Sequence, residues 1–303
     1  MSKAFLITGA SSGIGLDIVK HLADLNHTVY ATARMKTDLD NLDKIKNVIP
    51  LQLDVTKPDQ ITNAVSLVKS KNTGLFGLVN NAGLGGLGGF TTWNEAELHQ
   101  IFDVNVYGPW RMSNAFIDLL IESSGRIVNI GSQGGMITDK YFGPYTMTKH
   151  ALEAYTTALR LELEAHDVNV SIVQPGGIET DIVSNSMPGI IRRFKRALSP
   201  FKDEADQVLE SFQEPPSIPD DEPESKSNRK PSSPKIVTDG VHHALFSKNP
   251  KPCYLVGTKW EGDRVINGLL KKIVLENDNP NHNYSRDELI VMFDKHLNAH
   301  LSN

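Results

Sequence analysis

The sequence predicts an α/β protein built on one doubly wound parallel sheet. Three observations indicate this fold class: short apolar runs, segments of helical length between them, and the regular alternation of the two over residues 3 to about 180. A continuous apolar run is typical of a strand buried on both faces, and such strands separated by helices form parallel β-α-β units. We therefore expect a single main domain, a central sheet covered by helices on both faces.

Six strands are expected, one from each apolar run. In chain order the runs are AFLIT (4–8), HTVYATA (27–33), VIPLQLDV (48–55), GLFGLVNNAG (74–83), GRIVNIGS (125–132) and NVSIVQPG (169–176). The segments between them have helical length. The first carries apolar residues at helical spacing, namely Ile14, Ile18, Val19, Leu22 and Leu25.

The character of the chain changes after the sixth run. Residues 190–198 are a short basic amphipathic stretch, and residues 199–224 carry nine acidic side chains against one lysine. Six prolines and five serines crowd residues 215–234. Such a composition buries too little apolar surface to order itself. We expect a first unit over 1–190, which contains the sheet, and a C-terminal extension over 191–303 that contains a disordered, mobile insertion at 199–235.

Two closing helices are expected after this insertion. The first has an apolar stripe formed by Val265, Ile266, Leu269, Leu270, Ile273 and Val274. The second, SRDELIVMFDKHL (285–297), begins with Ser285 and Glu288 at the spacing of a capping box. Helices of this kind usually dock on their own core, and we expect these to serve as a substrate lid.

Composition excludes several classes of protein. The net charge of -5 comes from scattered residues, without the basic stripe of a nucleic-acid binder. The single cysteine, Cys253, cannot close an intramolecular disulfide or build a cysteine-rich zinc site, and the ten histidines show no ligand spacing, so we expect no metal. No apolar run reaches the roughly 18 residues that span a bilayer. These observations favour a soluble cytoplasmic protein.

The stretch TGASSGIG, residues 8–15, follows the first predicted strand. In a doubly wound sheet this turn faces the ligand crevice. Glycines there let the backbone approach a pyrophosphate, while the following helix offers free N–H groups and a positive dipole end. The stretch is therefore a candidate phosphate cradle, although a glycine-rich turn alone is equally explained by tight packing.

Three further features follow in order: NNAG at 80–83, GS at 131–132, and Tyr145 four residues before Lys149. With them the chain resembles the short-chain dehydrogenase/reductase family, in the branch of retinol and hydroxysteroid dehydrogenases. The matching hallmarks are Thr8-Gly9-x-x-x-Gly13-x-Gly15, Asn80-Asn81-Ala82-Gly83, Ser132, Tyr145-x-x-x-Lys149 and Pro175-Gly176. The resemblance covers residues 3 to about 182 and implies a Rossmann-like oxidoreductase that acts on CH–OH groups.

The Tyr-x-x-x-Lys spacing has a chemical reason. Residues four apart share a helix face, so the Lys149 ammonium can lie near the Tyr145 phenol. Lowering a phenol pKa of about 10 by roughly three requires about 4 kcal/mol, which a lysine and an oxidised nicotinamide could together supply. Tyr145 would then act as general acid or base. The resemblance implies that Ser132 orients the substrate oxygen and that Asn105 holds a water linking the lysine to solvent.

Cofactor preference depends on the end of the second strand, VYATAR. An acidic residue there grips the ribose hydroxyl of NAD, whereas Arg34 suits the 2'-phosphate of NADP, so we predict NADP, with NAD as the alternative. The resemblance adds an adenine-contacting pair, Asp54 and Val55, and a carboxamide contact, Thr180. The candidate cofactor-binding residues are Gly9, Ser11, Ser12, Gly13, Ile14, Gly15, Arg34, Asp54, Val55, Asn81, Ala82, Gly83, Tyr145, Lys149, Pro175, Gly176, Ile178 and Thr180.

The substrate is predicted less sharply. The resemblance implies a lipophilic, steroid-, retinoid- or lipid-like alcohol or carbonyl, and pairing into a homo-oligomer through helices of the fourth and fifth units. Beyond residue 180 the apolar residues Met187, Ile190, Ile191 and Phe194 either line a pocket or lid or are buried packing. A basic set, Arg192, Arg193, Lys195 and Arg196, raises the hypothesis that the lid rests on an anionic membrane surface.

Two other functions stay open at this point. Epimerases and dehydratases that act on nucleotide sugars share the fold and the Tyr-x-x-x-Lys pair, but they usually have another glycine spacing and a larger C-terminal domain. A non-catalytic NADP-binding regulator is the second alternative, because a fold does not determine a function. Such regulators tend to lose the tyrosine or the lysine, and this chain has both.

Overall fold

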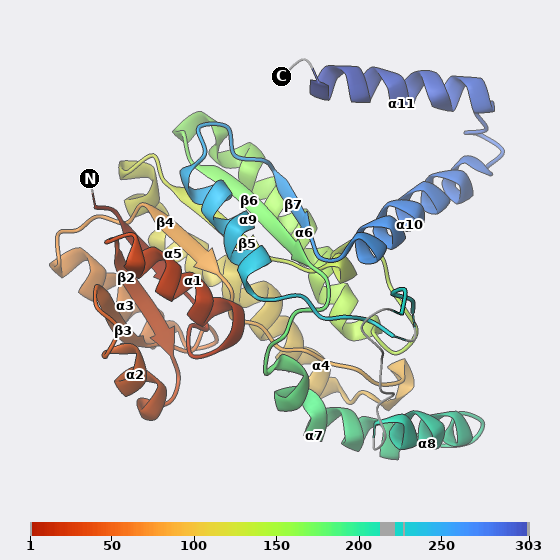
Figure 1. Ribbon diagram of the computed structural model, residues 1–303, viewed down its shortest axis with the longest axis horizontal. Helices are drawn as coiled ribbons and strands as arrows, with labels where there is room; N and C mark the ends of the chain where they lie inside the picture. The colour runs from red at the N-terminus through yellow and green to blue at the C-terminus, as the bar shows by residue number, and fades with distance from the viewer. Residues whose placement is uncertain (1, 213–221, 227, 302–303) are drawn as a thin grey trace. The chain divides into compact units, whose positions relative to one another are not determined.

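A computed structural model describes residues 2–212, 222–226 and 228–301. Seven parallel strands form one sheet in the order β3-β2-β1-β4-β5-β6-β7 (Figure 1). The strands are β1 (Ala4–Ile7), β2 (Thr28–Ala33), β3 (Val48–Gln52), β4 (Gly77–Asn80), β5 (Arg126–Ile130), β6 (Asn169–Pro175) and β7 (Cys253–Val256). The first six coincide with the six apolar runs, so the predicted doubly wound parallel sheet is confirmed.

The strand order reverses at β1, and this reversal positions the site. Leu6 of β1 lies opposite Tyr30 of β2 on one side and opposite Leu78 of β4 on the other. The chain therefore passes from β1 to β2 on one side of the sheet and from β4 to β5 on the other, so these two connections leave in opposite directions. At such a switch point a crevice opens beyond the carboxyl ends of the strands, where ligands bind in sheets of this kind.

Helices cover both faces of the sheet (Figure 1). Their bounds are α1 (Gly13–Asp24), α2 (Lys36–Leu42), α3 (Pro58–Ser70), α4 (Glu95–Phe102), α5 (Gly108–Glu122), α6 (Gly143–Leu163), α7 (Ile182–Lys195), α8 (Lys202–Ser211), α9 (Lys235–Phe246), α10 (Lys259–Asn277) and α11 (Arg286–Leu301). One core lies under α3, α5 and α6, with Phe116 fully buried, and the other under α1, α2 and α9, with Ile18 fully buried. Each such side chain contributes about 1.5–3 kcal/mol through burial.

The expected insertion at 199–235 differs from the prediction where the structure describes it. Residues 202–211 form α8, whose Ala205 packs with Phe194 of α7, and a half-buried Phe212 follows. Ser232 pairs with Ile178 at the end of β6. The few apolar residues in this acidic segment are spaced to share one face, and that face is what orders the helix. Residues 213–221 and 227 lie outside the described residues.

The chain divides into two compact units, residues 1–262 and 263–303. The second unit contains most of α10 and all of α11. At the start of α11 the Ser285 N–H donates to Glu288 Oε2 at 2.8 Å, and the Glu288 N–H donates back to Ser285 Oγ at 3.3 Å, so the capping box is confirmed. Docking of these helices on the core stays a prediction. Among residues 2–212, 222–226 and 228–301, no helix combines the length and apolarity needed to cross a bilayer.

Candidate active site

A cavity of about 730 Å³ lies at the carboxyl ends of the strands. With the exception of Asn105, the candidate catalytic and cofactor-binding residues from the sequence all line it. They are Gly9, Ser11, Ser12, Gly13, Ile14, Gly15, Arg34, Asp54, Val55, Asn81, Ala82, Gly83, Ser132, Tyr145, Lys149, Pro175, Gly176, Ile178 and Thr180. The turns after six different strands thus meet at one site, although the residues are up to 171 positions apart in sequence.

The glycine-rich turn after β1 is shaped to hold an anion. Gly9 has φ +63°, and a Cβ there would lie 2.8 Å from Cα of Ala82, so any other residue would be strained and crowded. A Cβ on Gly15 would collide with the Gly9 carbonyl. Ser12, at the start of α1, makes no side-chain cap, and the first turn has no acidic residue. The N–H groups of Gly9 and Ala10 donate to Thr32. The first N–H groups of α1 have no intrahelical acceptor, so they are available to a phosphate, which fits a dinucleotide.

Thr8 and Asn81 join the turns after β1 and β4. Thr8 Oγ1 accepts hydrogen bonds from the N–H groups of Asn81 and Ala82, at 2.9 and 3.0 Å. Asn81 Nδ2 donates to the carbonyls of Thr8 and Gly9, both at 2.9 Å. These reciprocal bonds fix the two sides of the switch point relative to each other and hold the anion-binding turn in shape.

Ser132, Tyr145 and Lys149 meet at another part of the same cavity. Tyr145 lies beside Ser132, close enough for the serine hydroxyl to influence the pKa of the phenol. Ser132 Oγ accepts a hydrogen bond from the Gly134 N–H at 3.0 Å. Lys149 Nζ lies 5.8 Å from the centre of the Tyr145 ring and donates to the Ile130 carbonyl at 2.9 Å. Both side chains come from α6, whose helical spacing puts them on one face.

The pKa of Tyr145 lies above its ordinary value in the protein alone. Burial raises this pKa, and the neighbouring Ser132 hydroxyl opposes the rise without reversing it. Burial also lowers the pKa of Lys149 to about 8, opposed by the nearby Glu153 carboxylate. The lysine alone therefore does not lower the pKa of the phenol, because desolvation of both groups dominates when no other cation is present.

Asn105 lies one layer behind the cavity, in a π-helical turn over Asp103–Tyr107. Its Oδ1 accepts from the Leu84 N–H at 2.7 Å, and its Nδ2 donates to the Leu84 carbonyl at 2.9 Å and to Thr148 Oγ1 at 3.1 Å. These contacts position the loop after β4 against α6. The water-holding role that the resemblance implies stays a prediction.

Several residues of the cavity wall were not predicted from the sequence. Asp38, one turn after Arg34, lines the end where β2 terminates. The other wall residues that were not predicted include Leu84, Val104, Ile182, Asn185 and Ser186. Asp38 could have been identified from the sequence because it lies so close to Arg34, whereas the start of α7 has no recognisable motif. The described residues contain no group of three or more His, Cys, Asp or Glu side chains placed to hold a metal.

The apolar residues of α7 were expected either to line a pocket or lid or to be buried packing, and the structure favours packing. Ile190 and Phe194 are buried with Leu87 and Tyr141, and Met187 joins this cluster, so these residues are packing and do not line the cavity. Ile191 is absent from the cavity wall as well.

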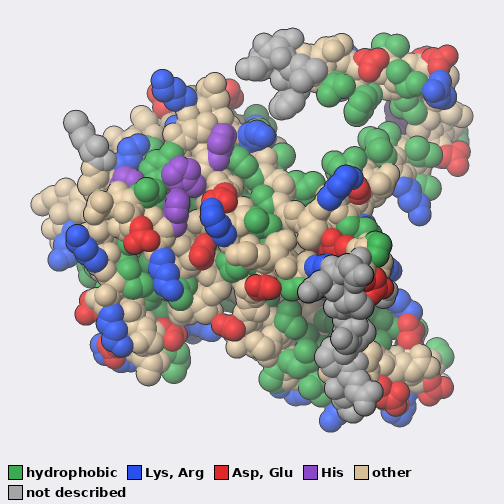
Figure 2. Space-filling model, viewed as in Figure 1, with side chains coloured by type: hydrophobic (Ala, Val, Ile, Leu, Met, Phe, Trp, Pro, Cys, Tyr) green, Lys and Arg blue, Asp and Glu red, His purple; other side chains and the backbone are tan. Residues whose placement is uncertain are grey.

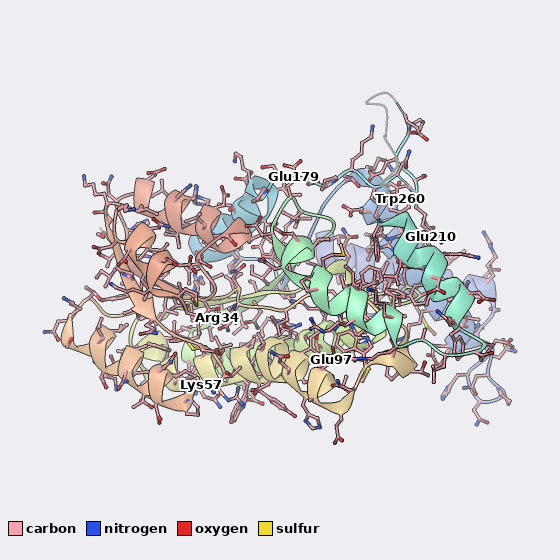
Figure 3. The ribbon with its side chains drawn as sticks, turned by 90° about the horizontal axis from the view of Figure 1, so that it is seen from below. Arg34, Lys57, Glu97, Glu179, Glu210 and Trp260 are labelled. Carbon is pink, nitrogen blue, oxygen red and sulfur yellow. The ribbon has the colours of Figure 1, made fainter. Side chains whose placement is uncertain are left out.

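The basic face of α7 is also smaller than the sequence predicts. Arg193 is 5% exposed, contacts Glu97 of α4 at 3.5 Å and lies over the Trp93 ring at 3.9 Å. Arg196 also pairs with Glu97, which is labelled in Figure 3. Of the four cations proposed to face a membrane, two therefore bind the same internal carboxylate, and only Arg192 and Lys195 remain for such a surface.

This sheet, with a glycine cradle after its first strand and a Tyr–Lys pair at its carboxyl edge, has the architecture of the Rossmann-like oxidoreductases. Residues 3–190 match the family model described as short chain dehydrogenase. The chain belongs to this family.

The chain is similar in sequence to several curated proteins of this family. The chain is 33% identical over 221 residues to mitochondrial D-beta-hydroxybutyrate dehydrogenase of Bos taurus, covering 69% of this chain and 62% of that protein. It is 33% identical over 268 residues to estradiol 17-beta-dehydrogenase 2 of Mus musculus, covering 84% and 68%. It is 30% identical over 278 residues to the uncharacterized oxidoreductase YbbO of Escherichia coli K12, covering 91% and 93%.

Solved structures agree with the fold. A short-chain dehydrogenase from Streptomyces avermitilis superposes with a TM-score of 0.74 at 26% identity, covering 91% of this chain and 95% of that one. The actinorhodin polyketide ketoreductase, solved with NADPH, superposes with a TM-score of 0.68 at 25% identity, covering 84% and 95%.

Proposed function

We propose that the protein is an NADP-dependent oxidoreductase that interconverts an alcohol and a ketone or aldehyde. One observation carries the proposal: the anion-binding turn of β1 and the Ser132–Tyr145–Lys149 cluster line the same cavity. A cofactor held by its pyrophosphate at the first would extend toward the second. The dehydrogenase names of the relatives and the NADPH-bound ketoreductase support this assignment.

The side chains suggest how the reaction would proceed. When bound, the reduced nicotinamide would supply a hydride to the carbonyl carbon. Tyr145 would donate its phenolic proton to the carbonyl oxygen, and Ser132 would hold that oxygen by a hydrogen bond. In the oxidative direction Tyr145 would accept the proton. The charge of Lys149, added to that of the oxidised nicotinamide, would offset the burial that raises the phenol pKa.

Arg34 supports NADP over NAD. It lies exposed at the end of β2, on the cavity wall, where a guanidinium can bind a 2'-phosphate with two hydrogen bonds (Figure 3). Asp38 lies on the same wall and would repel that phosphate. We give Arg34 the greater influence because it directly follows the strand, and the two charges provide a direct test of the preference.

A neutral lipophilic substrate fits the cavity better than a hydroxy acid. Of the described residues that line it, the cations are Arg34, at the β2 end, and Lys149, whose Nζ already donates to the Ile130 carbonyl. The wall also includes the apolar residues Leu84, Val104 and Ile182 and the acid Asp181. Apart from Arg34 and Lys149, a substrate carboxylate would find no cation among the described wall residues, and it would meet an acid. Steroid-like carbonyls are therefore the class that we propose.

The test is the loss of reduced-nicotinamide absorbance on mixing the protein with NADPH or NADH and a panel of carbonyls. The panel contains steroid ketones, retinal and long-chain aldehydes, with acetoacetate as the charged comparison. Turnover of neutral ketones, faster with NADPH, supports the proposal. Turnover of acetoacetate alone would replace the substrate class, and tight NADPH binding without turnover of any carbonyl would favour a non-catalytic regulator.

We also propose a homo-oligomer. The outer faces of α5 and α6 expose large apolar residues, among them Trp110, Met147 and Leu161, which are 50%, 41% and 62% exposed. A second copy would bury these side chains. Sedimentation of the wild type and of Trp110→Glu tests the idea: an oligomer that the variant dissociates supports it, and a monomeric wild type rejects it.

A further inference from the structure

Glu261, outside the residues that match the family model, is a buried carboxylate beside the cofactor-binding loop. It is 1% exposed and lies in the first turn of α10. It does not line the cavity. A buried charge is costly unless it is fully hydrogen-bonded, so its position calls for a physical reason.

Part of that reason is a helix cap. The Glu261 N–H donates to Thr258 Oγ1 at 3.3 Å, and Glu261 Oε2 accepts from the Thr258 N–H at 3.0 Å, which is a capping box. The other carboxylate oxygen has a different partner. Oε1 accepts from the N–H of Gly177 at 2.6 Å, in the loop that follows β6. One side chain thus caps α10 and holds the loop that carries Pro175, Gly176 and Ile178.

The surrounding glycines are explained by this carboxylate. A Cβ on Gly176 would collide with it, and a Cβ on Gly257 would lie 2.5 Å from Oε2 and 2.8 Å from Nε2 of Gln133. Gln133 directly follows Ser132, and its Nε2 donates to the Val256 carbonyl at 3.3 Å. The turn between β7 and α10 therefore touches both the loop after β6 and the turn that carries the catalytic serine.

We propose that Glu261 is a positioning residue that holds the Pro175–Gly177 loop in the conformation that binds the nicotinamide half of the cofactor. The inference rests on the proposed function. A carboxylate is required because two N–H groups, from Gly177 and Thr258, each donate to a separate oxygen. Glutamine offers one oxygen, so in Glu261→Gln one of these donors faces an NH₂ group and the loop loses its anchor.

The experiment compares Glu261→Gln with Glu288→Gln, which removes the matching glutamate of the exposed capping box of α11. Calorimetry measures the Kd for NADPH and for 2',5'-ADP, which has no nicotinamide. We expect Glu261→Gln to raise the Kd for NADPH by about tenfold, the effect of one lost hydrogen bond to a charged group, and to leave the Kd for 2',5'-ADP unchanged. Glu288→Gln should change neither.

Three results would overturn the inference. An unchanged Kd for NADPH in Glu261→Gln means that the loop needs no anchor. An equal loss for NADPH and 2',5'-ADP means general damage to the fold. A wild type that does not bind NADPH removes the proposed function and the inference with it, and so is distinguishable from the other two. If Glu261→Gln does not fold, hydrogen exchange of the wild-type Gly177 amide decides: slow exchange supports the anchor and fast exchange contradicts it.

Discussion

Arg34 and Asp38 set opposite charges at the β2 end of the cavity. We predict that Arg34→Ala raises the KM for NADPH by about tenfold and leaves that for NADH nearly unchanged, because only NADPH carries the phosphate. Asp38→Ala should lower the KM for NADPH by removing a like charge. Steady-state kinetics with both cofactors measure this, and an equal effect of Arg34→Ala on both would place Arg34 at a different part of the cofactor.

The lowered pKa of Lys149 predicts that activity falls at high pH. Its pKa is lowered to about 8 by burial, so the free enzyme loses this charge as pH rises through 8. Because kcat/KM reports the groups of the free enzyme, kcat/KM for NADPH should fall above about pH 8. Lys149→Met should be slow at every pH and lack this fall. A wild-type profile that stays flat to pH 10 would show that the charge is not needed.

Residues in short motifs were predictable, and those that act through distant contacts were not. The Tyr145–Lys149 spacing and the glycines of TGASSGIG follow from local geometry, so the sequence placed them at the cavity. The raised pKa of Tyr145 depends on burial that no motif encodes. Glu261 was missed because its partner Gly177 is 84 residues away in sequence.

At the scale of elements, Glu97 of α4 holds α7 against the body of the protein. It pairs with both Arg193 and Arg196, and its side chain is 16% exposed. We predict that Glu97→Gln raises the KM for the carbonyl substrate several-fold, because α7 contributes Ile182, Asn185 and Ser186 to the cavity and a buried Arg193 without its carboxylate is destabilising. The Kd for 2',5'-ADP should not change.

Glu95 provides the matched control for this prediction. It lies on the same helix, and its side chain is 88% exposed and paired only with His99 in the described structure. Glu95→Gln should leave the substrate KM as in the wild type. If the two variants have the same effect, the pairing of Glu97 with α7 is not what shapes the cavity.

Six of the seven strands were predictable because burial on both faces leaves a continuous apolar run. Strand β7 was missed for the opposite reason: it is an edge strand of four residues in which exposed Cys253 and Leu255 alternate with half-buried residues. Helix α8 was missed because its few apolar residues stand among acids, and their partners on α7 are visible only in the fold.

At the scale of the whole molecule, histidines gather on the face where α1 and α9 lie (Figure 2). His21 Nε2 and His242 Nδ1 are 2.9 Å apart and join the two helices. Burial lowers the pKa of His242, and the charge of His21 lowers it further. Burial likewise lowers the pKa of His27, with help from Lys3. Double protonation would remove the acceptor from the His21–His242 hydrogen bond.

The fold should therefore lose stability in acid. Because these pKa values are lower in the folded state, the unfolded state binds more protons as pH falls below about 6.5, the ordinary pKa of histidine, and the free energy of unfolding declines from there toward the folded-state pKa. Urea unfolding at pH 8 and pH 5 measures this decline, which His242→Gln should reduce. His282→Gln, at an exposed site, should not, and equal declines in both variants would contradict the assignment.

The proposed mechanism requires Tyr145 to transfer the proton in a nicotinamide-dependent reduction within this cavity. The most direct measurement is single-turnover oxidation of bound NADPH by a neutral steroid ketone, in the wild type and in Tyr145→Phe. We predict that the variant binds NADPH as tightly as the wild type and oxidises it about 10²–10⁴-fold more slowly, the usual contribution of a general acid. Oxidation at the wild-type rate in Tyr145→Phe would contradict the account.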